Sequence, residues 1–387
     1  MIKHIFKLIW NKKKSNSLMI LEILLSFLVL FFVLSYIFYN TGRANLPLGF
    51  ETENRWRISL DNIDKLDSLE GATILTSLKQ NLLAMDEVEA VTFTPSMSPF
   101  INSQWRDGTD LNGFPMHCMV MQVDLDMRDV LGLNVTAGRW FNEDDRNAVT
   151  KPVLVNQMFI DEYYNGQSMI DSTFLFDDPR HIVGVFEAYR YNGQFNEPLP
   201  MVMYLRHFTD NNDHVVALMA DNVNANFEEE LAMMVNTTTK TTGSVIENLE
   251  KVKVEDSRES WLLIYALLFI CIFLCLNVAL GLFGVLWYNI NKRKSEIGLR
   301  QALGAHKMDI MKQFIFEIMV VTFIALIVGV FFAIQVPILK VTEFPDSLFY
   351  KSIVFSSIII LVLVLSCALL PSIQASKITP AVSLHED

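Results

Sequence analysis

The sequence predicts an α-helical membrane protein with four transmembrane helices and a mixed α/β extracytoplasmic domain inserted between the first and second spans. Of the 387 residues, 51% are hydrophobic and the mean hydropathy is +0.31, which is too apolar for an ordinary soluble protein. The apolar residues concentrate in four long runs. Between the first two runs lies a polar stretch of roughly 220 residues, long enough for a domain with its own core.

The chain begins with a basic segment that leads into the first apolar run. Residues 1–17 carry five lysines and no acidic residue. Their apolar side chains share one helical face, which predicts an interfacial amphipathic helix on the inner leaflet. Residues 18–39 form an apolar run too long for the core of a cleaved signal peptide, and they predict transmembrane helix 1. We expect Glu22 in this span to be paired or to reach the membrane surface.

The domain that follows, predicted at residues 40–255, is acidic. Residues 40–260 hold 17 Lys and Arg against 35 Asp and Glu, a net charge of −18. The first part of the domain predicts a βαβ-like unit, with a strand, a helix and a second strand at 56–60, 72–85 and 89–93. After this unit come short strands around a helix at 157–164, with Gly138 and Gly184 as bends.

Three further apolar runs complete the membrane part. Residues 256–289 predict a helical stalk that continues into transmembrane helix 2, while 313–339 and 348–371 predict helices 3 and 4. An outer loop at 340–347 joins the last two spans, and 372–387 form a cytoplasmic tail. Small residues recur every four positions in spans 2 and 3, a spacing that favours close helix packing in lipid. They are Cys271, Cys275, Ala279, Ala325, Gly329 and Ala333.

A short basic segment, residues 290–312, separates the second and third spans and has a helical pattern of its own. Glu296 and Arg300 are four residues apart, in the order that favours a helical ion pair. Gly304 provides a stop, and a second helix is expected from about Lys307. From these features alone, an ordinary basic cytoplasmic loop and a dedicated docking helix are equally open interpretations.

This segment resembles the signature of the FtsX/MacB family of ABC transporter permeases. The family pattern is a basic cluster, then Glu-Ile-Gly, an Ala-x-Gly-Ala, and a Phe-x-x-Glu that enters the next span. The matching positions are Lys292, Arg293, Lys294, Glu296, Ile297, Gly298, Ala302, Gly304, Ala305, Phe314 and Glu317. In that family the segment is a coupling helix that docks on a cytoplasmic ATPase. The resemblance therefore implies ATPase-coupling roles for Glu296, Ile297, Gly298, Arg300, Ala302, Gly304 and Ala305.

Two other regions are similar to the same family. In the middle of the domain the matching positions are Gly138, Arg139, Phe141, Val153, Val155, Val183, Gly184 and Val185. Near the C-terminus they are Pro371, Ala375, Pro380 and Ala381. The resemblance implies a β-rich subdomain at about 100–205, with flanks at about 50–100 and 210–245 that form an α/β subdomain.

The sequence lacks the patterns that mark catalytic, cofactor or metal sites. There is no Gly-x4-Gly-Lys-Ser/Thr loop to cradle nucleotide phosphates, and the seven histidines lack metal-ligand spacing. Of the four cysteines, only Cys118 lies outside the apolar runs, so no disulfide framework is predicted. Membrane topology accounts for the basic residues without nucleic acid. For Glu317, pairing with a base such as Lys312 or Lys292 is favoured over a proton-relay role.

The resemblance implies a non-catalytic permease subunit that transmits motion driven by a separate cytoplasmic ABC ATPase subunit to the extracytoplasmic domain, to export or release a substrate. This mechanism requires a dimer with a second copy or a related permease, and it admits a periplasmic adaptor or outer-membrane partner. The alternative is an FtsX-like regulator that activates an extracellular cell-wall hydrolase without transport. Four spans place both termini on one side of the membrane, and the basic N-terminal segment and loop predict that this side is the cytoplasm. The resemblance implies that the membrane is a bacterial inner membrane.

Overall fold

The computed structural model describes residues 13–60, 68–94, 97–101, 106–111, 114–167, 169–175, 178–206, 214–221, 223–224, 226–342 and 344–376. The chain forms two compact units. The helical unit comprises Met1–Gly42 and Trp261–Asp387, and the globular unit is Arg43–Ser260. Of the expected interfacial helix, residues 1–12 lie outside the described residues and the remainder belongs to the first long helix. Residues 377–387 of the expected tail also lie outside them.

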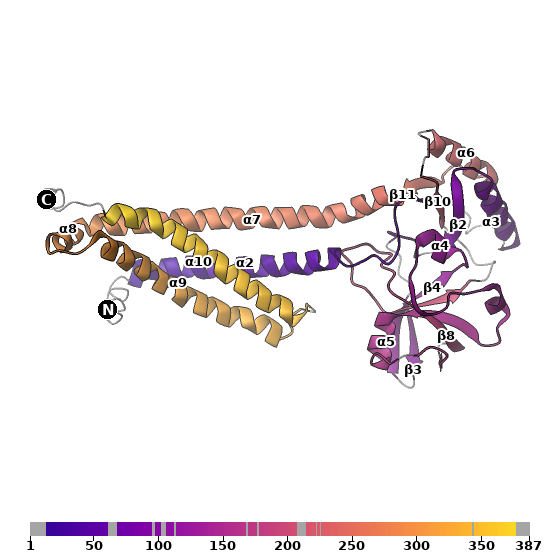
Figure 1. The fold of residues 1–387 in the computed structure, drawn as a ribbon, viewed down its shortest axis with the longest axis horizontal. Coiled ribbons are helices and arrows are strands. Elements are labelled where there is room, and N and C mark those ends of the chain that lie inside the picture. The colour runs from indigo at the N-terminus through magenta and orange to yellow at the C-terminus, as the bar shows by residue number, and fades with distance from the viewer. Residues whose placement is uncertain are drawn as a thin grey trace. The chain divides into compact units, whose positions relative to one another are not determined.

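Among the described residues, four helices are long and apolar enough to cross a membrane, which confirms the predicted number of spans. They are α2 (Lys13–Ala44), α7 (Leu249–Lys292), α9 (Lys307–Ile338) and α10 (Asp346–Ser376) (Figure 1). The 44 residues of α7 form one uninterrupted helix of about 66 Å. Since a bilayer core is about 30 Å thick, α7 is roughly twice as long as a span requires.

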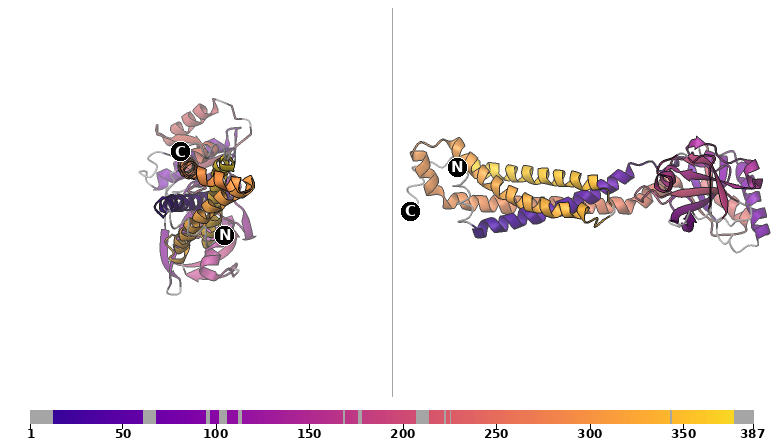
Figure 2. Two further views of the ribbon diagram at one scale, coloured as in Figure 1. Left: turned by 90° about the vertical axis from the view of Figure 1, so that its left-hand side faces the viewer. Right: turned by 90° about the horizontal axis from the view of Figure 1, so that it is seen from below.

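The four long helices share an apolar core, and the right-hand view of Figure 2 shows them running alongside one another. Phe27 and Phe31 of α2, Leu282 of α7 and Ile360 of α10 are fully buried in it. Gly329 of α9 lies against Phe27 so closely that a Cβ atom there would be 2.5 Å from the ring carbon Cδ1. The absence of a side chain at this glycine therefore allows α2 and α9 to approach each other.

The small residues predicted to form packing seams in spans 2 and 3 are buried to different extents. The seam of α9 is confirmed, because all three of its small residues are buried: Ala325, Gly329 and Ala333. In α7, Cys271 is buried, but Cys275 and Ala279 are only half-buried. The buried stripe of α7 runs instead through larger side chains: Val278, Leu282 and Leu286.

The globular unit contains a four-stranded antiparallel sheet packed against two helices. In chain order the elements are β1 (Arg55–Ser59), α3 (Ser68–Leu83), β2 (Val88–Thr94), β10 (His214–Met219), α6 (Phe227–Thr239) and β11 (Val245–Asn248). The strand order across the sheet is β11-β1-β10-β2, the arrangement of a ferredoxin-like pair of split βαβ units. The predicted βαβ-like unit is present, but β10 lies between its two strands.

A second, seven-stranded sheet is formed by the chain between β2 and β10. Its order is β3-β4-β9-β6-β8-β5, with β7 paired to β8. The strands are β3 (Arg106–Leu111), β4 (Phe114–Val123), β5 (Val135–Gly138), β6 (Lys151–Asn156), β7 (Thr173–Leu175), β8 (Pro179–Phe186) and β9 (Met201–Leu205). Three short helices accompany them: α4 (Met127–Leu131), η2 (Glu143–Asn147) and α5 (Gln157–Tyr164). The pairs β4–β9 and β6–β8 are parallel, and the others are antiparallel.

The two predicted bends, Gly138 and Gly184, are register partners where β5 pairs with β8. Gly138 has φ +74°, the left-handed region that favours glycine. A Cβ atom on Gly138 would overlap the carbonyl of Val183, and one on Gly184 would overlap the carbonyl of Arg139. The close approach of β5 and β8 therefore requires glycine on both strands.

Replacing either glycine should destabilise the globular unit. Because backbone atoms cannot move aside cheaply, we expect Gly138→Ala and Gly184→Ala each to lower the free energy of unfolding by about 2 kcal/mol. Gly71→Ala is the control, since Gly71 lies in α3 with nothing within 4 Å of its missing side chain. Thermal unfolding of the full chain in detergent measures the effect. Equal stability of the three variants would contradict this account.

Candidate coupling site

The chain between α7 and α9 folds as a short helix between two breaks. Arg293 leaves helical geometry with φ −109° and ψ 15°, and α8 (Lys294–Ala302) follows it. The backbone then turns at Gly304, which has φ +97°, so the predicted stop at this glycine is confirmed. The next helix, α9, begins at Lys307.

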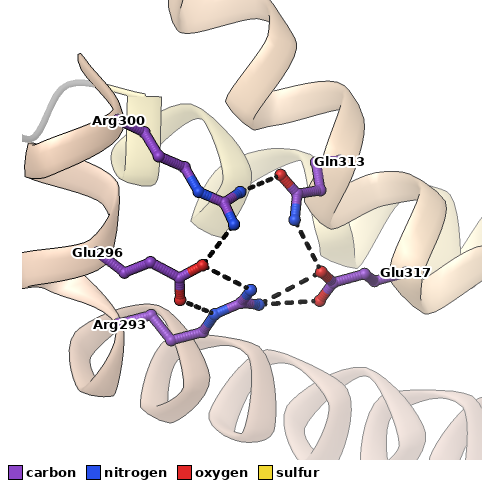
Figure 3. Close-up of polar contacts among 5 residues, drawn as sticks. All are labelled: Arg293, Glu296, Arg300, Gln313 and Glu317. Atoms are coloured by element: carbon purple, nitrogen blue, oxygen red, sulfur yellow. Dashed lines mark hydrogen bonds and ion pairs between the residues drawn. The ribbon is translucent and has the colours of Figure 1, made fainter. Parts of the chain in front are cut away.

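Five polar side chains around α8 form a closed ring of hydrogen bonds and ion pairs (Figure 3). Arg293 Nε donates to Glu296 Oε2 at 3.0 Å, and Arg293 Nη1 donates to Glu317 Oε2 at 3.1 Å. Arg300 Nη2 donates to Glu296 Oε1 at 2.5 Å, while its Nη1 donates to Gln313 Oε1 at 2.7 Å. Gln313 Nε2 completes the ring by donating to Glu317 Oε1 at 3.1 Å. The predicted ion pair of Glu296 with Arg300 is confirmed.

Arg293 is the most enclosed charged group of this ring, since its side chain is only 11% exposed. Its guanidinium also lies over the ring of Phe314, 5.4 Å from the centroid. Burial disfavours the positive charge, but hydrogen bonds to Glu296 and the charge of Glu317 outweigh burial and raise the pKa of Arg293 above its usual value. A cation in this position therefore depends on both carboxylates.

An apolar cluster and one further hydrogen bond fix α8 to the neighbouring helices. The cluster consists of Ile290, Ile297, Ile310, Phe314 and Ala375, which come from α7, α8, α9 and α10. Gln301 Nε2 donates to the carbonyl of Ser376 at 3.2 Å, which adds a polar link from α8 to α10. As a result, α8 is held by side chains from three long helices.

The seven residues predicted to couple an ATPase divide into two groups in the structure. Four of them hold α8 in place, through the ring or through buried positions: Glu296, Ile297, Gly298 and Arg300. The other three lie at the end of α8 or just after it. Ala302 and Gly304 are exposed, and Ala305 is half-buried. Three large apolar residues of the same segment are exposed, and we call them the coupling face: Leu299, Leu303 and Met308, exposed by 55%, 80% and 56%.

Sequence reasoning missed the role of Arg293 and misassigned the partner of Glu317. The expected pairing of Glu317 with a nearby base is confirmed, but the base is Arg293 and not Lys312 or Lys292, the two examples named from the sequence. Lys312 precedes Glu317 by five residues, a spacing that places it on a different side of α9, and it is exposed. Arg293 and Glu296 are three residues apart, and this spacing is the sequence feature from which their ion pair could have been predicted.

Known proteins are similar to this chain over parts of its length. Residues 263–380 match the family model described as FtsX-like permease C-terminal. A macrolide export ATP-binding/permease protein, MacB of Neisseria gonorrhoeae, is 24% identical over 273 residues, which cover 67% of this chain and 42% of that protein. The ABC transporter permease YvrN of Bacillus subtilis is 26% identical over 294 residues, 69% of each chain. The chain thus spans less than half the length of this MacB relative.

Two solved structures are similar to part of the chain. The periplasmic region of MacB from Actinobacillus actinomycetemcomitans is 16% identical, covers 53% of this chain and 92% of that chain, and gives a TM-score of 0.38. The extracellular domain of the transporter YknZ from Gram-positive bacteria is 15% identical, covers 50% of this chain and 100% of that chain, and gives a TM-score of 0.35.

The fold and the site define a multi-pass membrane protein with an α/β domain between its first and second spans and a short, fixed helix between its second and third. Over residues 263–380 and across its curated relatives, this chain is similar to FtsX/MacB-like permeases of ABC transporters.

Removal of the Glu317 carboxylate should loosen α8. Glu317→Ala leaves the enclosed Arg293 with Glu296 alone, so we expect local opening to become easier by about 2 kcal/mol, which corresponds to roughly thirtyfold. Tryptic cleavage after Arg300 and Lys307 in the native protein measures this opening. Lys312→Ala is the control and should leave the cleavage rate unchanged. Faster cleavage in the control alone would show that Lys312 supports the segment.

Proposed function

We propose that this chain is the non-catalytic permease subunit of an ABC transporter and that it transmits ATPase-driven motion across the membrane to export or release a substrate. The observation that carries the proposal is the pairing of a fixed α8 with the exposed coupling face. A helix held by a closed polar ring and by three long helices passes an applied force to them instead of yielding locally. The FtsX-like match of residues 263–380 supports this assignment.

The partner in this proposal is a separate cytoplasmic ATPase chain that docks on the coupling face. Exposed Leu and Met side chains gathered on one segment are typical of a protein interaction surface. The name of the MacB relatives joins an ATP-binding part to a permease, and the present chain has no phosphate-binding glycine loop of the Walker type. In our proposal, α8 lies on the cytoplasmic side of a bacterial inner membrane, with the globular unit outside.

Motion would travel along α7. This helix runs without a break from Leu249 in the globular unit to Lys292, the residue before Arg293 of the ring. Its N-terminus directly follows β11, the edge strand of the four-stranded sheet. Asn248 joins the strand to the helix, because its Oδ1 accepts hydrogen bonds from the backbone N–H of Glu250 at 2.9 Å and of Lys251 at 3.3 Å. Thr52 donates a further hydrogen bond to the carboxylate of Glu250. A movement of α7 therefore acts on the sheet without an intervening loop.

Within the globular unit, the loop at 190–197 contacts the end of α2 and the start of α7. Arg190 is 3% exposed, and its Nη1 donates to the carbonyls of Arg43 at 3.1 Å and Leu46 at 3.0 Å. Gly193 has φ +97° and packs so closely on Asp256 of α7 that a Cβ atom would overlap its carboxylate. We call these contacts the Arg190 latch. In our proposal, the latch makes α2 and α7 move together with the globular unit.

The proposed mechanism uses two permeases, because paired ATPases close on two coupling faces at once. The second permease is a further copy of this chain or a related one, and a periplasmic adaptor or outer-membrane protein is the proposed partner of the globular unit. Regulation of an extracellular cell-wall hydrolase without transport uses the same transmission, and the proteins that copurify distinguish the two functions.

Charging the coupling face should abolish ATPase binding. We expect Leu299→Asp combined with Leu303→Asp to lose at least about tenfold of the ATPase recovered with the tagged protein, because the face becomes acidic while the ring is untouched. Glu296→Lys and Gly304→Pro should act indirectly, by disrupting α8. Leu83→Asp is the matched control, since Leu83 of α3 is 46% exposed. Copurification from native membranes with mass spectrometry is the measurement.

The outcomes of this pull-down separate the two functions. Recovery of an ATPase together with an exported or released ligand supports transport, and recovery of an ATPase together with a cell-wall hydrolase supports regulation. Normal ATPase recovery with the doubly charged variant, in correctly inserted protein, would contradict docking on the coupling face.

Breaking the Arg190 latch should separate docking from transmission. Arg190→Ala removes the hydrogen bonds that hold the end of α2, so we expect the ATPase to copurify normally. The ATP-dependent change in hydrogen exchange of the globular unit should be lost. Arg128→Ala, at an exposed arginine of α4, is the control and should keep the response. A normal response in Arg190→Ala would rule out transmission through the latch.

A further inference from the structure

Three basic residues form a row across neighbouring strands at one end of the seven-stranded sheet. Lys151 of β6 and Arg180 of β8 are register partners in a parallel pair. On the other side of β6, Val153 pairs with Tyr204 of β9 in antiparallel register, and continuing that register by two residues brings Arg206 opposite Lys151. Like charges directly opposite one another destabilise a sheet. This arrangement therefore calls for a compensating anion.

A cavity of about 220 Å³ lies at this end of the sheet, and four basic side chains line it: Arg146, Lys151, Arg180 and Arg206. Two acidic residues also line it, Asp145 and Asp178. Between residues 106 and 206 there are eight Lys and Arg against fifteen Asp and Glu. Half of the basic residues of an acidic region thus meet at a single small cavity.

The acidic residues at the cavity do not balance this charge. Asp145 accepts two hydrogen bonds from Arg139, at 2.6 Å and 2.8 Å, and these bonds lower the pKa of its carboxyl despite burial. Arg139 does not line the cavity, so Asp145 is already neutralised from elsewhere. Asp178 is exposed to solvent, where a carboxylate contributes little to the charge balance of a cavity.

Two of the four basic side chains have no carboxylate partner among the described residues. Lys151 Nζ donates to the carbonyl oxygen of Arg146 at 3.2 Å, which leaves its positive charge uncompensated. Arg180 lies over the ring of Tyr204, 5.6 Å from the centroid. The phenol oxygen of Tyr204 accepts a hydrogen bond from Gln122 at 2.9 Å, which holds the ring in place beneath Arg180. A guanidinium stacked in this way keeps its N–H groups free to bind an oxyanion side-on.

We infer that this cavity, with Lys151 and Arg180 at its centre, binds one oxyanionic group, a carboxylate or a phosphate, of a ligand that extends beyond it. A volume of about 220 Å³ is below the roughly 300 Å³ at which pockets enclose a whole drug-sized ligand, so only the charged group enters. The surrounding acidic surface repels anions at long range, and binding therefore depends on this local cluster. The inference does not rest on the proposed coupling function.

Thermal unfolding of the full chain in phosphatidylcholine nanodiscs tests this inference. Inorganic phosphate and succinate are each titrated against chloride at equal ionic strength, because a ligand that binds the folded state raises the unfolding temperature. We expect one or both probes to stabilise the protein where chloride does not. Arg180→Gln should weaken the apparent affinity at least about tenfold, and Arg128→Gln, at an arginine outside this cavity, should leave it unchanged.

A second variant, Lys151→Gln, separates binding from folding because it keeps the stacked Arg180 and Tyr204. It relieves the repulsion in the row, so its unfolding temperature without added anion should be equal to or higher than that of the unmodified protein, and its response to anions should be lost. A response to phosphate alone identifies a phosphate-bearing ligand, and a response to succinate alone identifies a carboxylate. Equal responses in all variants, or no response beyond that to chloride, would overturn the inference.

Discussion

The position of α8 depends on the charge of one arginine. Arg293 is placed where water reaches little of its side chain, so its guanidinium must be matched by carboxylates from the protein. Glu296 and Glu317 supply them from two helices, and Gln313 and Arg300 complete the ring. Because a charge without partners is costly in such a site, α8 cannot turn or shift without breaking several of these bonds. The exposed Leu299, Leu303 and Met308 are therefore presented on a fixed base.

A second buried arginine performs a similar task in the globular unit by different chemistry. Arg190 binds backbone carbonyls, those of Arg43 and Leu46 among them, at the end of α2. The carbonyl groups at a helix C-terminus are unsatisfied and carry partial negative charge, so a guanidinium both caps the helix and is compensated by it. Burial and the nearby Arg43 lower the pKa of Arg190 from its usual value, and the guanidinium nonetheless stays charged at neutral pH. The ends of the long helices are thus held by arginines in both units.

The sequence predicted the features of this protein that depend on local pattern. Hydropathy located the four spans, and spacing located the Glu296–Arg300 pair and the stop at Gly304. It could not predict contacts that depend on distant pairing. The insertion of β10 between β1 and β2 joins segments more than 100 residues apart, and the Arg293–Glu317 ion pair spans 24 residues. The inward turn of Arg293 follows from a helix break, which shifts the side-chain direction away from that of a continuous helix.

Charge pairing separates the basic residues that are compensated within the chain from those that the inferred anion would compensate. Arg57 with Glu247 and Arg139 with Asp145 are compensated within the chain, at 2.6 Å in each case, so their charges add little to the surrounding field. Lys151 and Arg180 are adjacent in register, and the described residues offer them no carboxylate. A net charge of −18 over residues 40–260 hides this difference, because a sum over the sequence does not record which charges meet. Folding brings together three basic residues that are 26 to 55 positions apart in the chain. Their mutual repulsion destabilises the folded protein, and a bound anion would remove this repulsion and so bind more tightly.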